Sequence, residues 1–297
     1  MRYLILTIVI LLSTACLYSE ELSELQSMEL EVVAEERPGS YNIAEFRLWH
    51  PNINRKPSAV LVLVPGANGD GRGMARDKKW QTLAAEFNWL IIACYLKGGN
   101  YQRPEAGSGD ALLDAIEQMG ETVGQTGLED LPFLMWGTSA GGQFNFNYAQ
   151  WKPKQVLTFV VNKGAYYTAE RDKKVRKIPA LFFIGMKDSE LRMKNISGLF
   201  FEGREKDAPW ALIREPDQAH TIGASKEFSR EYFRTIFPMR LPEGEDELQE
   251  IELDQGFVGH LETYEIAQNE DVDWDPEDSA WLPSQELMDS WLKIVIP

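Results

Sequence analysis

Cysteine is nearly absent from this sequence: of the 297 residues only Cys16 and Cys94 are cysteines. Cys16 follows an N-terminal apolar stretch, and Cys94 lies in the apolar run 89–95. If Cys16 carries a lipid, no internal disulfide can form. We expect Cys94 to be a buried, unreactive thiol.

Long hydrophobic runs are also missing. After a charged start, the apolar stretch 4–12 is too short to span a bilayer. The pattern is typical of an export signal at residues 1–16, followed by a polar linker at 17–40. Two endings of the signal stay open. Ser13-Thr14-Ala15 fits ordinary cleavage, whereas Cys16 after Thr14-Ala15 resembles a bacterial lipoprotein box, although that box prefers leucine where Ser13 stands. We predict a protein of the bacterial periplasm, cell surface or exterior, attached to a membrane only if Cys16 is lipidated.

Basic residues are scarce at the C-terminal end. Residues 241–297 contain 17 Asp or Glu and one Lys, which accounts for the whole formal net charge of −16. Because no basic patch or arm is evident, we expect no nucleic acid partner. The acidic C-terminal extension, 238–297, also contains Trp274, Trp281 and Trp291. We expect it to pack in part onto the main domain, with carbohydrate binding through exposed tryptophans as the alternative.

Metal and cofactor motifs are lacking as well. The chain has three histidines, and no convincing cluster of metal ligands stands out. The acidic stretch 271–275 resembles a calcium loop, but Pro276 and Leu282 occupy positions that need glycine and a bidentate acid. The glycine-rich loop 65–73 follows an apolar run, yet Met74 stands where a dinucleotide motif needs its third glycine. We therefore predict neither a metal nor a cofactor.

Residues 131–150 carry the clearest chemical pattern. An apolar run ends in Gly137-Thr138-Ser139-Ala140-Gly141, which has the G-x-S-x-G spacing, and a segment suited to a helix follows. Such a turn places its serine at a positive φ, and glycines two positions away make room for the neighbouring chain. It also puts Ser139 at a helix N-terminus, which favours a developing oxyanion. The pattern occurs by chance too, but its flanks make Ser139 the candidate nucleophile.

Apolar runs alternate with segments suited to helices along the middle of the chain. Continuous apolar runs are typical of strands buried on both faces of a parallel sheet. The expected strands cover 41–49, 59–64, 89–95, 131–136, 155–161, 180–184 and 210–214, and the expected helices cover 78–87, 110–120, 141–150, 191–201 and 224–237. This order predicts an α/β domain over 41–237, with a mostly parallel central sheet and helices on both faces.

A serine nucleophile needs a base, and the base needs an orienting carboxylate. His220 lies in a polar loop after the last expected strand, whereas His50, beside a proline, is interpreted as a surface residue. Asp188 follows the strand 180–184 at the carboxyl edge of the sheet, where α/β sites assemble, although it could instead cap the next helix. Asp217 competes as the acid but lies too near His220 in sequence. We predict Ser139, His220 and Asp188 as the catalytic residues.

The loop 65–73 is suited to an oxyanion hole, because its glycines let a backbone N–H approach a substrate without obstruction. The N–H of Ala67 or Asn68 is the candidate donor in this loop. The N–H of Ala140, next to the nucleophile, is the second candidate.

The chain order Ser139, Asp188, His220 is the order of an α/β-hydrolase. Together with the serine turn, the loop and the strand alternation, it makes residues 41–237 resemble that superfamily. The loop Pro65-Gly66-Ala67-Asn68-Gly69 departs from the His-Gly-Gly-Gly pattern of many lipases. It is similar to that of the compact secreted esterases, a group that includes polyhydroxyalkanoate-depolymerase-like, feruloyl-esterase-like and dienelactone-hydrolase-like proteins. Serine rather than cysteine at position 139 speaks against a true dienelactone hydrolase. The resemblance implies hydrolysis of carboxylic esters through an acyl-enzyme.

Only residues 162–179 separate two expected strands at the point where many relatives insert a lid. So short a segment favours an open cleft that admits a small-molecule ester or a bulky carbohydrate-linked or polymeric one. Tyr166 and Tyr167 could line this cleft or pack against the sheet. Two other hypotheses stay open, a serine peptidase of the same fold and a non-catalytic surface binding protein on a hydrolase scaffold.

Overall fold

The computed structural model describes residues 26–164, 167 and 173–296. The predicted export signal with Cys16 lies outside these residues, and so does Tyr166. Within the described ranges no helix has the length and apolar character needed to cross a membrane.

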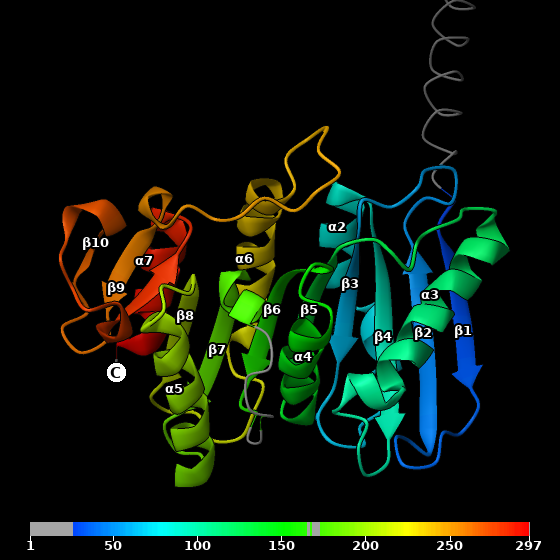
Figure 1. Cartoon of the computed structure of the whole chain (residues 1–297), viewed down its shortest axis with the longest axis horizontal. Coiled ribbons are helices and arrows are strands. Elements are labelled where there is room, and N and C mark those ends of the chain that lie inside the picture. Colours follow the sequence, from blue (N-terminus) through cyan, green and yellow to red (C-terminus); the bar gives the residue numbers. More distant parts are fainter. Residues whose placement is uncertain (1–25, 165–166, 168–172, 297) are drawn as a thin grey trace, which may run out of the picture.

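An eight-stranded sheet forms the centre of the molecule, with the strand order β1-β2-β4-β3-β5-β6-β7-β8 (Figure 1). The strands are β1 (Met28–Ala34), β2 (Ile43–His50), β3 (Ala59–Val64), β4 (Trp89–Lys97), β5 (Phe133–Thr138), β6 (Val156–Asn162), β7 (Ala180–Gly185) and β8 (Trp210–Glu215). Strands β3 to β8 run parallel, and β2 is antiparallel to both of its neighbours. The predicted mostly parallel sheet is confirmed.

Helices cover both faces of this sheet (Figure 1). They are α2 (Lys78–Phe87), α3 (Ser108–Val123), α4 (Ala140–Trp151), α5 (Glu190–Arg204) and α6 (Ser225–Arg240). Helices α2 and α6 pack together on one face, while α3, α4 and α5 lie on the other. Because both faces are covered, every residue of β3, β6 and β7 is buried, which explains their continuous apolar sequences.

Two sequence predictions are wrong on the N-terminal side of the sheet. Residues 17–40 are not simply a linker, because Met28–Ala34 forms β1, paired antiparallel with β2. The buried or half-buried residues of β1 alternate with exposed ones, such as Glu29 and Glu31, as in an edge strand with one wet face. His50 is not at the surface either. It is fully buried, with its Nε2 3.2 Å from Gln125 Oε1.

The C-terminal residues pack beside β8. They form a three-stranded sheet, β9 (Phe257–His260), β10 (Ile266–Gln268) and β11 (Ser279–Leu282), followed by α7 (Gln285–Val295). Trp281 and Trp291 are buried, and Trp291 Nε1 donates a hydrogen bond of 2.9 Å to the carbonyl of Leu212 in β8. For these two tryptophans the structure favours core packing over carbohydrate binding.

Candidate active site

The turn at Ser139 connects β5 directly to α4. Ser139 has φ 53° and ψ −120°, a strained conformation for a residue with a side chain. The close approach of neighbouring backbone explains the flanking glycines. A Cβ atom on Gly141 would lie 2.2 Å from the carbonyl oxygen of Val64, and one on Gly137 would lie 2.4 Å from the carbonyl oxygen of Gly141. The G-x-S-x-G pattern therefore marks a turn that no larger residue can form at these two positions.

The structure brings Ser139, His220 and Asp188 together. In the chain His220 lies 81 residues from Ser139 and 32 residues from Asp188. His220 Nε2 lies 3.0 Å from Ser139 Oγ, and His220 Nδ1 lies 2.9 Å from Asp188 Oδ2. Both distances are hydrogen-bonding distances. With Nδ1–H donating to the carboxylate, Nε2 is left as an acceptor facing the serine hydroxyl.

Asp188 is held as a carboxylate by its surroundings. Its side chain is 5% exposed, and this burial alone would raise its pKa. The backbone N–H of Ser189, the ring of His220 and the guanidinium of Arg192 outweigh burial, so that the pKa of Asp188 lies below its ordinary value. The competing acid, Asp217, is exposed and instead pairs with Lys187 at 2.8 Å.

The loop after β3 lies next to the serine. A Cβ atom on Gly66 would come within 3.5 Å of Ser139 Cβ, so the backbone of this loop borders the site. The N–H of Asn68 donates to the hydroxyl of Tyr101 at 3.3 Å. Within the described part of the chain the N–H groups of Ala67 and Ala140 have no acceptor. Of the two candidates in the loop, the geometry therefore favours Ala67.

Tyr167 packs inward. Its ring meets Phe146 edge-to-face at 5.4 Å, and its hydroxyl is buried without a partner among the described residues. Burial raises the pKa of this hydroxyl. The packing alternative is thus favoured for Tyr167, whereas Tyr166 lies outside the described residues.

Asn162, at the end of β6, joins the serine to the histidine loop, and sequence reasoning did not identify it. Its carbonyl oxygen accepts the N–H of Ser139 at 2.7 Å. Its side-chain Nδ2 lies 3.3 Å from the carbonyl oxygens of both Thr221 and Ile222, directly after His220. One fully buried residue therefore contacts both sides of the Ser139–His220 pair.

A buried ion pair lies behind this residue. Lys163 Nζ contacts Glu215 Oε2, and the two side chains are 1% and 4% exposed. Lys163 Nζ also donates to Asn162 Oδ1 at 3.2 Å, and Glu215 Oε1 accepts the N–H of Ala224 at 2.7 Å. The pair thus links the end of β6 to both ends of the loop that carries His220, which runs from Glu215 to Ala224. The sequence signal for these residues is that they follow or end the apolar runs of β6 and β8 at the carboxyl ends of these strands.

The loop that carries Asp188 and the loop that carries His220 are joined by backbone hydrogen bonds. The N–H of Met186 donates to the carbonyl of Glu215 at 3.0 Å, and that of Lys187 donates to the carbonyl of Gln218 at 2.9 Å. A Cβ atom on Gly185 would lie 2.4 Å from the carbonyl oxygen of Ala219. These contacts fix the position of Asp188 relative to His220.

Comparison with known proteins gives structural likeness only. No protein-family model matches the chain, and no curated protein sequence matches it. Among solved structures, a ferulic acid esterase superimposes with a TM-score of 0.54 and 13% identity over 71% of this chain and 98% of that one. Poly(aspartic acid) hydrolase-1 from Sphingomonas sp. KT-1 gives a TM-score of 0.51 and 16% identity over 68% and 97%. The fluorophosphonate-binding serine hydrolase F of Staphylococcus aureus gives 0.50 and 12% over 71% and 98%.

These likenesses confirm the predicted α/β-hydrolase fold. At such identities they carry the fold and not the activity. Any assignment of function must therefore come from the residues of the site itself.

Proposed function

We propose that this protein is an exported serine hydrolase that cleaves carboxylic esters through Ser139, His220 and Asp188. The observation that supports this most directly is the pair of contacts at 3.0 and 2.9 Å that join the serine hydroxyl, the imidazole and the buried carboxylate. The strained backbone of Ser139 at the start of α4 adds support, because such strain persists where a reactive side chain must be presented.

In the proposed reaction Ser139 Oγ attacks the ester carbonyl carbon while His220 Nε2 takes the hydroxyl proton. Asp188 holds Nδ1–H and stabilises the imidazolium that forms. When the tetrahedral intermediate collapses, the carbon–oxygen bond to the alcohol breaks, and His220 returns the proton to the leaving alcohol. Water then attacks the acyl-enzyme by the same route, which releases the carboxylic acid and restores Ser139.

The negative charge of the intermediate needs donors that are already in place. The N–H groups of Ala140 and Ala67 are proposed for this role, because both lack an acceptor within the described residues and both belong to segments that border Ser139. The N-terminal end of α4 adds its dipole at the same point.

The deciding experiment compares the purified protein with its Ser139→Ala variant on short-chain p-nitrophenyl esters. We expect kcat/KM to fall by at least about 10³-fold, since removal of the nucleophile leaves only binding and the oxyanion donors. A fluorophosphonate probe should label the parent protein and not the variant. Hydrolysis that the substitution leaves unchanged would refute the proposal.

The same assay separates the other two hypotheses. A serine peptidase would also cleave matched peptide p-nitroanilides, whereas an esterase would leave these amides essentially intact. A non-catalytic binding protein would cleave neither substrate and would not react with the probe.

Export and a bulky substrate are the finer parts of the proposal. The N-terminal sequence supports export, and mass spectrometry of protein from a native host would show whether the chain begins after Ala15, with or without a lipid on Cys16.

The short connection between β6 and β7 supports access by carbohydrate-linked or polymeric esters. We expect a feruloylated oligosaccharide to be hydrolysed at a rate similar to that of methyl ferulate, the small ester of the same acid.

A further inference from the structure

Arg240, the last residue of α6, is a buried cation with almost no partner. It is 5% exposed, and its Nε donates one hydrogen bond of 3.3 Å to the carbonyl of Leu157. Among the described residues no carboxylate forms an ion pair with it. Burial lowers the pKa of Arg240 to about 10, so the guanidinium stays charged at neutral pH.

Arg204 provides a useful contrast, because it is also buried, at 2% exposure. Its three nitrogens donate to the carbonyls of Pro276, Ser279 and Ala208 and to the hydroxyl of Ser279, at 2.8–3.1 Å. These bonds tie α5 to the C-terminal residues, which is a structural role. Arg240 has no comparable set of acceptors: the charge of Glu250 acts on it without a direct ion pair, and its two outer nitrogens form no hydrogen bond within the described residues.

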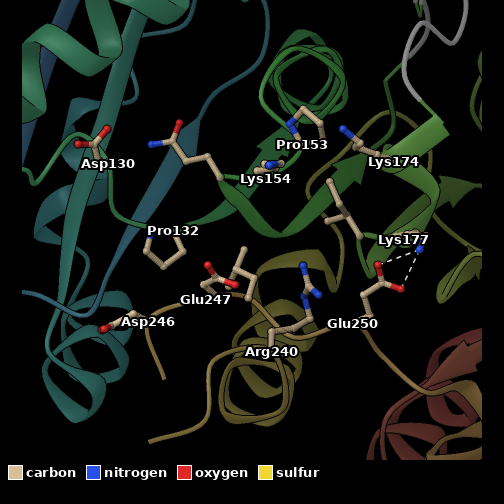
Figure 2. A pocket seen from close by; sticks show the side chains of 13 residues that line it. Asp130, Pro132, Pro153, Lys154, Lys174, Lys177, Arg240, Asp246, Glu247 and Glu250 are labelled. Atoms are coloured by element: carbon tan, nitrogen blue, oxygen red, sulfur yellow. Dashed lines mark hydrogen bonds and ion pairs between the residues drawn. The ribbon is translucent and has the colours of Figure 1, made fainter. Parts of the chain in front are cut away.

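Arg240 lines a cavity of about 590 Å³, within the range of small-molecule sites (Figure 2). The cavity lies at the amino ends of β5, β6 and β7, whereas Ser139 follows the carboxyl end of β5. It is therefore at the opposite edge of the sheet from the candidate active site. Figure 2 shows Arg240 extending from α6 into the space between the other lining residues, most of which carry a charge.

The rim carries charges of both signs. Lys177 is already paired with Glu250 at 2.8 Å, while Asp130, Asp246 and Glu247 are exposed acids. Exposed charges are screened by water, so the buried guanidinium is the least screened charge that lines the cavity. The acids at the rim oppose ligands with several negative charges. Pro132, Pro153, Ile178 and Leu248 add apolar lining.

We propose that this cavity binds a small organic carboxylate with a single negative charge and an apolar body. The two oxygens of the carboxylate accept hydrogen bonds from the two outer nitrogens of Arg240, in the bidentate geometry that a guanidinium favours. The apolar body lies against the prolines and aliphatic side chains of the wall. The site is separate from the ester hydrolysis proposed for Ser139, and it can be tested without an activity assay.

The experiment titrates the purified protein with benzoate by isothermal calorimetry and repeats the titration with inorganic phosphate. We expect benzoate to bind at one site and more tightly than phosphate. In Arg240→Met the benzoate affinity should fall at least tenfold, because the charged fork is lost while the side-chain volume is nearly kept. Lys154→Met, at the exposed rim, is the matched control and should change the affinity less than threefold.

Thermal unfolding without ligand distinguishes a binding role from a structural one. Arg240→Met should unfold close to the parent temperature, because the loss of one long hydrogen bond, to Leu157, is offset by the removal of a buried charge without an ion pair. Arg204→Met should unfold at a lower temperature, because it leaves several buried carbonyls without donors. The proposal is overturned if benzoate does not bind, if phosphate binds more tightly, or if Arg240→Met binds benzoate as well as the parent. It is also overturned if Arg240→Met unfolds at as low a temperature as Arg204→Met, which would indicate a structural role.

Discussion

Lys163 and Glu215 form an ion pair in the interior, at the ends of two strands that are not neighbours in the sheet, β6 and β8. The pair contacts Asn162 on one side and the backbone of Ala224 on the other. Its position shows how the loop that carries His220 is anchored. Among the described residues the pair forms no hydrogen bond with the side chains of Ser139, His220 or Asp188.

Removal of one member of this pair should be far more damaging than removal of both. Lys163→Met leaves a buried carboxylate, and we expect unfolding to become easier by about 3–5 kcal/mol. The double variant Lys163→Met, Glu215→Gln should recover part of that loss. Urea unfolding of the parent, both single variants and the double variant measures the coupling.

If the pair positions His220, these variants should also lower kcat with little change in KM for a short-chain ester. The double variant decides the matter when a single variant does not fold. Parent values of kcat in a folded double variant would limit the pair to a role in stability.

Asp188→Asn should preserve the fold but remove the orientation of His220. An amide at this position can donate to Nδ1 and so favour the wrong tautomer, with the proton on Nε2 facing Ser139. We expect kcat/KM for p-nitrophenyl acetate to drop by roughly 10⁴-fold. Asp217→Asn is the matched control, because Asp217 is exposed and pairs with Lys187, and it should stay within about threefold of the parent.

Asp188 should also affect how the free energy of unfolding decreases at acid pH. Because the pKa of Asp188 is lower in the folded protein than its ordinary value, its carboxylate contributes stability that is fully present above the unfolded pKa, about 3.9. That contribution is lost as the pH falls through the lower, folded pKa. Unfolding free energies measured from about pH 6 down to pH 3 should decline less steeply in Asp188→Asn than in the parent. Parallel curves would contradict the assignment.

Trp291 should hold the C-terminal residues against the main sheet. Its ring is buried and its Nε1 donates to the carbonyl of Leu212, so Trp291→Ala should lower the free energy of unfolding by about 3–5 kcal/mol. Trp274→Ala serves as the comparison, because Trp274 is only half-buried, and its effect should be smaller. Equal effects from the two substitutions would indicate that the C-terminal residues are not anchored by Trp291. Chemical unfolding monitored by circular dichroism measures both.

Local sequence determined the elements around the site with little ambiguity. Helix α2 has the predicted bounds, Lys78–Phe87, because Asp77 caps its first turn and Asn88 ends it in a left-handed conformation. The serine turn was equally clear, since only glycine tolerates the backbone approach at positions 137 and 141. By contrast, the edge strand Met28–Ala34 was missed, because its alternation with glutamates also fits a polar linker.

The sequence alone determined the chemistry that is present: a serine in a strained turn, a histidine and an aspartate after the right strands, and a mostly parallel sheet to carry them. Tertiary structure decided which polar groups meet. It placed His50 in the core, paired Lys163 with Glu215 across 52 residues of chain, made Asn162 the contact between Ser139 and the histidine loop, and left Arg240 buried at the far edge of the sheet. The physical reason is that apolar periodicity specifies which residues are buried, whereas the partner of a buried charge depends on strands that meet only in the folded sheet.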